Sequence, residues 1–138
     1  MPHSCHIIVE NNAAIIYASR GGAPDKVLPV LEKFLDTFWK ERDTFGVYVD
    51  TPECLIAQIT IRFGYATCED DFSNIRVGVH YNSTADYLYW VGLDHTVKVW
   101  VADEAYRKKP ELGLAGCSLW TDVTKISGDE RSIVDSPQ

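Results

Sequence analysis

The residue types best suited to hold an anion lie at one glycine-rich corner, Arg20-Gly21-Gly22. Glycines let backbone N–H groups approach a phosphate, the N-terminus of a following helix adds a favourable dipole, and Arg20 supplies a positive charge. The Gly-Lys-Ser/Thr ending of a P-loop is absent, so the corner is not a motif of that kind. The corner is therefore either a site for a small anion or a plain strand-to-helix turn.

Two further arginines and one histidine complete the candidate ligand-binding residues: Arg62, Arg76 and His80. His80 follows Arg76 closely in the chain and could bind or catalyse near neutral pH, the alternative being a solvated histidine at a strand end. Cys54 is expected in the first turn of a helix, where the dipole lowers the pKa of a thiol. No base accompanies Cys54 in the sequence, so core packing is the alternative for this residue.

No motif for a catalytic nucleophile or a metal site is present. The Gly-x-Ser-x-Gly pattern does not occur, and the neighbouring carboxylates Asp70 and Asp71 are typical of a solvated loop. The spacing of a metal finger is absent because no Cys-x-x-Cys pair exists among the four cysteines, which are Cys5, Cys54, Cys68 and Cys117. We therefore predict no catalytic residue, no metal and no cofactor, and four reduced thiols.

Aromatic side chains are concentrated on one expected hairpin, residues 85–93 and 96–102. Strand alternation places Tyr87 and Tyr89 on one side of this hairpin and Trp90 and Trp100 on the other. Both faces are thus partly apolar and need cover from another layer of the chain or from a second subunit. These rings could pack in the core, stack on bases or line an oligomer interface. We predict that these four residues form a homodimer interface.

The elements that position these residues follow from hydrophobic periodicity. Residues 5–10 and 13–19 are predicted to form a hairpin around Asn11-Asn12, because asparagine tolerates positive φ. A helix is predicted over 25–42, with a start nearer Leu28 if Pro29 interrupts its first turns. Its apolar stripe recurs at three-and-four spacing and comprises Val27, Val30, Leu31, Phe34, Leu35 and Phe38.

A second helix is predicted over 50–65, since Asp50-Thr51-Pro52-Glu53 has the composition of a helix start. The β-branched run Ile59-Thr60-Ile61 leaves a strand as the alternative there. Residues 44–49 are expected as a linker or short strand and 75–80 as a strand. After Asp103 the chain is expected to be loop-like, with a short edge strand near Leu119-Trp120.

Together these elements predict a single α+β domain over residues 1–126. An antiparallel sheet of about five strands, built from two hairpins, is expected to carry two helices on one face. Residues 127–138 are polar and are predicted to form a flexible tail. No repeat or linker divides the chain, and its 138 residues suit one domain.

The net charge of the chain limits the classes of partner that it could bind. The chain has 13 basic and 20 acidic residues and a net charge of −7. Duplex nucleic acid is disfavoured because its binding depends on phosphate neutralisation, whereas a local basic patch could still hold a small anionic ligand. No signal peptide or membrane span is recognised, so we predict a cytoplasmic protein that does not bind membranes.

Three stretches in the first part of the chain carry a family resemblance: Cys5-His6-Ile7-Ile8-Val9, Tyr17 through Pro24, and Val27 through Leu35. They resemble small phage and mobile-element proteins of mostly unknown function, in which a strand ends in Tyr-Arg-His-x-Asp-Gly-Tyr-Pro before a similar helix. Tyr17, Gly22 and Pro24 match that pattern, whereas its other defined positions hold Ala18, Ser19, Gly21 and Ala23. Residues 85–94 resemble the closing hairpin of that family. The resemblance implies an α+β protein of mobile-element origin without implying a reaction.

Three functions remain open at this stage. The first is a non-enzymatic binding or interaction protein of mobile-element or phage origin. The second is a protein that binds or sequesters small, including cyclic, nucleotides, since some phage proteins of similar size sequester cyclic nucleotide signals. Arg20, Arg62 or Arg76 would then act with tyrosine and tryptophan rings. The third is an enzyme with an unrecognised site.

Overall fold

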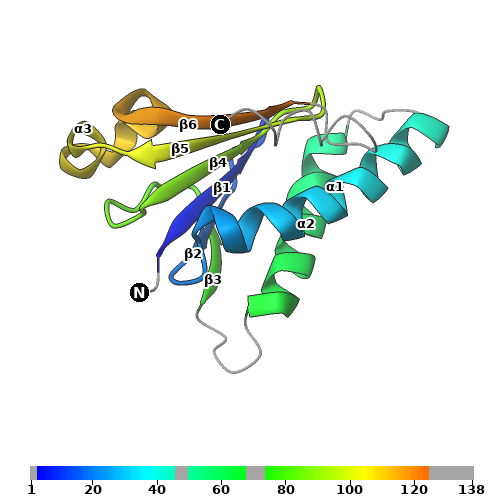
Figure 1. The fold of residues 1–138 in the computed structure, drawn as a ribbon, viewed down its shortest axis with the longest axis horizontal. Coiled ribbons are helices and arrows are strands. Elements are labelled where there is room, and N and C mark those ends of the chain that lie inside the picture. Colours follow the sequence, from blue (N-terminus) through cyan, green and yellow to red (C-terminus); the bar gives the residue numbers. More distant parts are fainter. Residues whose placement is uncertain (1–2, 46–49, 68–73, 125–138) are drawn as a thin grey trace.

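The computed structural model describes residues 3–45, 50–67 and 74–124. In Figure 1 one mixed β-sheet forms the central layer, with α1 (Pro24–Phe45) and α2 (Thr51–Thr67) packed against one face. The short helix α3 (Glu104–Lys108) and the 3₁₀ segment η1 (Pro110–Gly116) lie at the other side of the sheet. Three predicted segments lie outside the described residues. They are the part of the 44–49 linker that follows the end of α1, the acidic segment at 69–71, and the tail at 127–138.

The sheet has six strands in the order β3-β2-β1-β4-β5-β6. Their bounds are β1 Cys5–Val9, β2 Ile15–Ala18, β3 Ile75–Gly78, β4 Tyr87–Val91, β5 Thr96–Ala102 and β6 Cys117–Thr124. The central strands β1 and β4 pair in parallel, and every other neighbouring pair is antiparallel. The α+β class is confirmed, as are the two predicted hairpins, β1–β2 and β4–β5.

The expectation of a purely antiparallel sheet of about five strands was wrong. The chain leaves β3 at one edge, crosses the face of β2 and β1 that lies opposite α1 and α2 through residues 79–86, and enters β4 beside β1. This crossover makes β4 parallel to β1 and joins the two hairpins into one mixed sheet. The strand predicted near Leu119-Trp120 is confirmed as β6, which supplies the sixth strand and the opposite edge.

Helix α1 begins at Pro24, so the predicted alternative start near Leu28 was wrong. Pro29 lies inside the helix near its N-terminus, where its ring removes one backbone hydrogen bond without ending the helix. The second predicted helix is confirmed as α2, and the strand alternative at Ile59-Thr60-Ile61 is excluded. Its buried side is the spaced series Leu55, Ile59 and Phe63.

The loop-like assignment after Asp103 was wrong for residues 104–116, which form α3 and η1. Tyr106 is fully buried and anchors α3 against the sheet. Gly116 allows η1 to approach closely, because a Cβ at this position would lie 2.8 Å from the Tyr106 backbone. A single aromatic anchor therefore holds a segment whose composition looks irregular.

Two hydrophobic clusters lie on opposite faces of the sheet. The larger cluster joins Tyr89, Val97 and Val99 to the apolar sides of α1 and α2. The smaller cluster joins Ile8 and Leu88 to Tyr106, with Trp90 and Trp100 half-buried around it. The predicted alternation along β4 and β5 thus holds, and both sheet faces receive cover from the same chain. Within the described residues no helix is long and apolar enough to cross a membrane.

Candidate functional site

The glycine corner uses its backbone to pack the protein. The Gly22 N–H donates to the His3 carbonyl at 2.8 Å, and the Tyr89 hydroxyl donates to the Gly22 carbonyl at 2.6 Å. The Arg20 N–H donates to Asn74 Oδ1 at 2.9 Å. These N–H groups are already hydrogen-bonded, so in this conformation the corner behaves as a strand-to-helix turn and offers neither group to an anion.

The predicted arginines do not share one site. Arg76 lies on β3 with its guanidinium carbon 4.8 Å from the centre of the Tyr17 ring, on the face away from α1 and α2. Arg62 lies on α2, 5.7 Å from the Phe34 ring of α1. Arg20 lies at the glycine corner. His80 is exposed in the crossover segment 79–86. Of the predicted ligand residues, only Arg62 lines the groove between α1 and α2.

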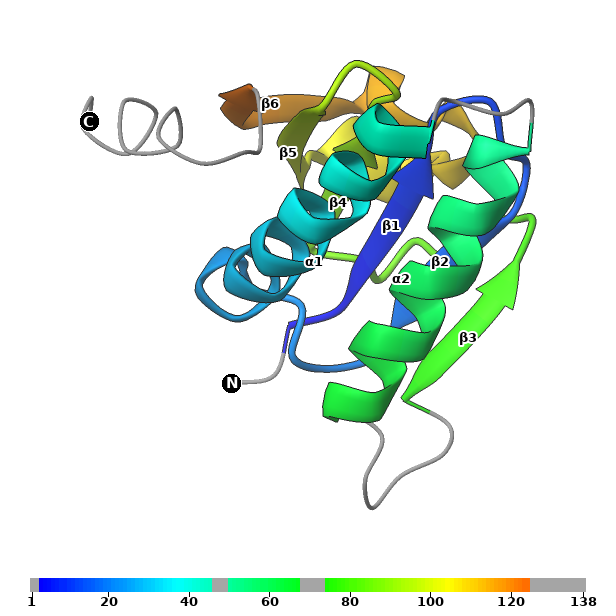
Figure 2. The same ribbon diagram turned by 90° about the vertical axis from the view of Figure 1, so that its right-hand side faces the viewer.

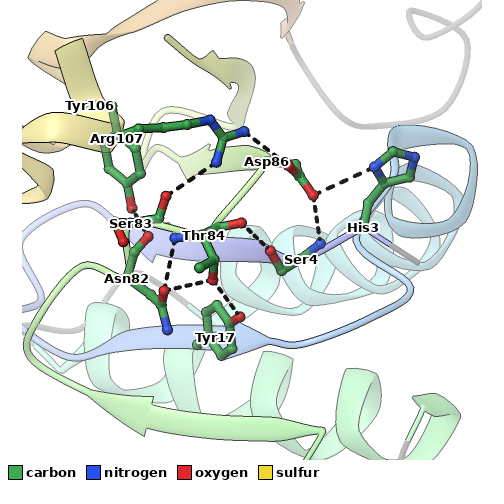
Figure 3. Close-up of polar contacts among 9 residues, drawn as sticks. All are labelled: His3, Ser4, Tyr17, Asn82, Ser83, Thr84, Asp86, Tyr106 and Arg107. Carbon is green, nitrogen blue, oxygen red and sulfur yellow. Dashed lines mark hydrogen bonds and ion pairs between the residues drawn. The ribbon is translucent and has the colours of Figure 1, made fainter. Parts of the chain in front are cut away.

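A polar network surrounds the crossover, and Figure 3 shows part of it. The Tyr106 hydroxyl of α3 donates to the Asn82 carbonyl at 2.6 Å, and the Ser4 hydroxyl donates to the Thr84 carbonyl at 2.6 Å. Asp86 accepts from the Ser4 N–H at 3.2 Å and from Arg107 Nη2 at 2.9 Å. The start of β1, the crossover and α3 are thereby tied together.

His6 lies buried beneath this network. Its Nε2 accepts the Asn82 N–H at 2.8 Å, so Nδ1 carries the ring proton and donates to the Ile16 carbonyl at 3.1 Å. Tyr17 and Tyr81 flank the imidazole at centroid distances of 5.2 and 5.4 Å. Both nitrogens are therefore occupied in holding the crossover onto the sheet, which is a structural role.

Burial also keeps two thiols neutral. It raises the pKa of Cys5 to about 12 and that of Cys117 to about 11. For His6, burial lowers the pKa to about 4, against the smaller raising effect of its hydrogen bond to Ile16. A neutral thiol is a poor nucleophile, and an imidazole whose lone pair accepts a hydrogen bond is not free to act as a base.

A groove lies between α1 and α2, with a volume of about 810 Å³. Figure 2 views the face of the molecule that carries these two helices in front of the sheet. The apolar lining consists of Pro29, Val30, Phe34, Phe38, Cys54 and Ala57. The polar lining consists of Lys33, Thr37, Glu41, Arg42, Gln58 and Arg62. A groove of this size is in the range of ligand sites.

Electrostatically the groove differs from the rest of the chain. Three basic side chains, Lys33, Arg42 and Arg62, line it against one acidic side chain, Glu41, in a protein of net charge −7. The Arg42 guanidinium carbon lies 5.0 Å from the centre of the Phe38 ring, and Arg62 lies similarly over Phe34. The Arg62 side chain is exposed, and a guanidinium stacked on a ring retains in-plane N–H donors that can contact a carboxylate or phosphate.

Sequence reasoning missed most of this groove. Phe34 and Phe38 were predicted only as part of the apolar stripe of the first helix, and Lys33 was not among the candidate ligand residues. A signal exists, because the apolar arc of α1 runs from Val30 to Trp39 and covers about half the circumference of the helix. That arc is wider than contact with one sheet requires, and its excess faces α2.

The predicted interface residues are divided between the two faces. Tyr89 is fully buried in the core and Tyr87 is half-buried on the same side, whereas Trp90 and Trp100 are half-buried beside the α3 cluster. The self-association of this chain stays a prediction. The more exposed apolar side chains on the sheet are at its edges, and on β6 they are Leu119 and Trp120.

Metal ligands are not clustered in the described ranges, where no group of three or more His, Cys, Asp or Glu side chains could hold an ion. No protein-family model, curated protein or solved structure matches the chain.

Proposed function

We propose that this protein is a non-enzymatic binding protein and that the groove between α1 and α2 is its binding surface. The observation that carries the proposal is the basic, aromatic-lined groove of about 810 Å³ on an otherwise acidic chain. Its ligand combines an apolar surface with carboxylate, phosphate or sulfonate groups. The mobile-element origin rests on the sequence resemblance alone and stays a prediction.

The physical basis of the proposal is that apolar and basic side chains line the same groove. Val30 and Phe34 are half-buried and offer apolar area that a ligand can remove from water, beside the buried Phe38. Lys33, Arg42 and Arg62 line the same groove and attract negative charge. The binding of an apolar anion is therefore stabilised both by burial of its apolar surface and by electrostatic attraction. His6, Cys5 and Cys117 support a binding role over a catalytic one. The Nε2 atom of His6 already accepts a hydrogen bond within the fold, and burial keeps the two thiols neutral.

The proposal is tested with 8-anilinonaphthalene-1-sulfonate, an aromatic anion whose fluorescence increases in an apolar site. We expect saturable binding to the folded protein, weakened about fivefold or more by Arg62→Glu because a charge is reversed beside the apolar surface. Lys26→Glu is the matched control, since Lys26 is an exposed residue of α1 that does not line the groove. Absence of binding, or equal weakening by both variants, would contradict the proposal.

A second candidate is a binder of small nucleotides. The pairs Arg42–Phe38 and Arg62–Phe34 favour it, because each places a cation beside a ring within one groove. A cyclic dinucleotide or mononucleotide that binds there would raise the thermal midpoint by mass action, and Arg62→Glu would remove the shift. Arg76→Ala on the opposite face is the control. No shift with any nucleotide would eliminate this candidate.

A further inference from the structure

The positive charge that the groove offers to a ligand lies mainly at one level along its length. The Arg62 side chain is exposed on α2 and reaches across to α1, where its guanidinium carbon lies 5.7 Å from the centre of the Phe34 ring. Lys33, the neighbour of Phe34 in the chain, is also exposed and lines the groove. One arginine and one lysine are therefore placed near the level of Phe34.

The second arginine of the groove is already used within the protein. Arg42 is half-buried, its guanidinium carbon lies 5.0 Å from the centre of the Phe38 ring, and it takes part in a further interaction within the chain. Glu41 precedes it and is the acidic residue of the lining. A second negative charge at this level would face a carboxylate and an arginine that is already engaged. The groove therefore favours a ligand with a single negative charge.

Accessible apolar surface lies directly beside the level of Arg62. Val30 and Phe34 are half-buried and lie four residues apart, so they share one side of α1 within about 6 Å of helix length. Pro29 and, across the groove on α2, Ala57 are exposed members of the same lining. Because the cation and the apolar surface adjoin, a ligand that matches both has an anionic group at one end of an apolar body.

We infer that the ligand is an amphiphile with one terminal carboxylate, an inference that rests on the proposed function of the groove. Its carboxylate pairs with Arg62, and its apolar body lies over Val30 and Phe34. The planar guanidinium of arginine matches a carboxylate with two parallel N–H donors, and one guanidinium neutralises one negative charge. Lys33 adds a second, more strongly hydrated positive charge at the same level.

The test uses decanoate with the full chain, measured by isothermal titration calorimetry below the concentration at which decanoate forms micelles. Decanoate should bind saturably. Decylammonium, which has the same apolar chain and the opposite charge, should bind at least about tenfold more weakly. Butanoate, which has the same carboxylate on a shorter chain, should also bind at least about tenfold more weakly because it buries fewer methylene groups.

Decanedioate tests the single charge on the unaltered protein. It has a carboxylate at each end of a chain as long as that of decanoate, so its second carboxylate must lie on apolar surface or near Glu41. Its binding should therefore be weaker than that of decanoate by about fivefold or more. Decanedioate, decylammonium or butanoate binding as tightly as decanoate overturns the inference.

Variants of the two arginines assign the carboxylate contact. Arg62→Gln should weaken decanoate at least about fivefold and leave decylammonium no weaker, because it removes a positive charge at an exposed position. Arg42→Gln should weaken decanoate less than Arg62→Gln does, and Lys26→Gln, outside the groove, should leave its affinity unchanged. A larger effect of Arg42→Gln, in a variant that circular dichroism shows to be folded, overturns the inference. If that variant unfolds, the comparison of decanedioate with decanoate decides.

The outcomes separate the ligand class from the groove itself. If the naphthalene sulfonate binds in an Arg62-dependent manner and decanoate does not, the monocarboxylate is wrong while the groove remains the binding surface. If a cyclic dinucleotide binds in an Arg62-dependent manner and more tightly than decanoate, the inference is overturned in favour of the nucleotide candidate. If neither the sulfonate nor decanoate binds, both proposals fail.

Discussion

At the residue scale, His6 shows how one side chain can fix a crossover. It is 1% exposed and faces the sheet side opposite α1 and α2, with Asn82 donating to one nitrogen and Ile16 accepting from the other. Protonation would remove the acceptor at Nε2 and place a charge among tyrosine rings. Burial therefore lowers its pKa from 6.5 to about 4.

The stability of the protein should consequently fall in acid. Between pH 6.5 and about 4 the unfolded chain binds a proton at His6 that the folded chain does not. The contribution is therefore complete above pH 6.5 and is lost as the pH falls toward 4, by about 2–3 kcal/mol. Urea unfolding at several pH values measures this loss. His6→Gln should flatten it, whereas His80→Gln, at an exposed position in the same crossover, should retain it.

Gly22 is a second position where a single atom matters. A Cβ there would lie 2.8 Å from the Cys5 Cβ and 2.9 Å from the His3 carbonyl oxygen. Gly22→Ala should destabilise the fold by about 1–3 kcal/mol because these backbone and core atoms cannot move away freely. Gly78→Ala is the control, since nothing lies within 4 Å of its Cβ, and it should change stability by less than about 0.5 kcal/mol. Equal effects in denaturant unfolding would refute this account of the corner.

At the element scale, α3 and the crossover stabilise one another. The Tyr106 hydroxyl reaches the Asn82 carbonyl, while Arg107 of the same helix contacts Asp86 and the Ser83 carbonyl nearer the surface (Figure 3). The tyrosine ring is fully buried, whereas the Arg107 side chain is 42% exposed. Of the two links, the buried one contributes more to holding the crossover.

Tyr106→Phe should therefore cost about 1 kcal/mol, because it leaves the Asn82 carbonyl without its hydroxyl donor. Arg107→Ala should cost less than about 0.5 kcal/mol, since an exposed ion pair is screened by water. Urea unfolding measures both, and hydrogen exchange at the Asn82 amide reports local opening of the crossover. A larger loss for Arg107→Ala than for Tyr106→Phe would show that the surface contacts dominate.

The elements that sequence predicted well depend on local signals. Asn11 adopts φ 65°, as the hairpin required, and alternation along 87–102 placed each side chain on its observed face. The parallel pairing of β1 with β4 was not predictable in this way, because the local sequence of a strand does not specify which other strand pairs with it. The crossover that creates the pairing is held by Ser4, His6 and Tyr106, which contact it across separations of 80, 76 and 24 residues.

The candidate site was predictable only in part for the same reason. Arg62 was predicted as a ligand residue from its charge, and it lines the groove. Phe34 and Phe38 have the periodicity of core residues, which is the same whether their neighbour is a sheet, another helix or a partner. Only the position of α2 beside α1 turns the edge of that stripe into a groove wall.

At the scale of the whole molecule, the chain covers both faces of its own sheet. The homodimer predicted from the doubly apolar hairpin is thus not required to shield Tyr89, which is buried by α1 and α2, or Leu88, which is buried beside Tyr106. The surface that remains for self-association is an edge of the sheet. In the described part of the chain β6 pairs only with β5, and its Leu119 and Trp120 are 51% and 54% exposed.

We expect self-association, if the dimer prediction is correct, to use this edge of β6, because an unpaired strand with exposed apolar side chains favours pairing with another strand. Light scattering over a range of concentrations should show the mass rising toward that of a dimer, and Trp120→Lys should return it to the monomer. Val79→Lys is the matched control, since Val79 is 61% exposed beside the opposite edge strand β3. A monomer at every concentration would eliminate the dimer. A dimer sensitive to Val79→Lys rather than Trp120→Lys would move the interface to the other side of the sheet.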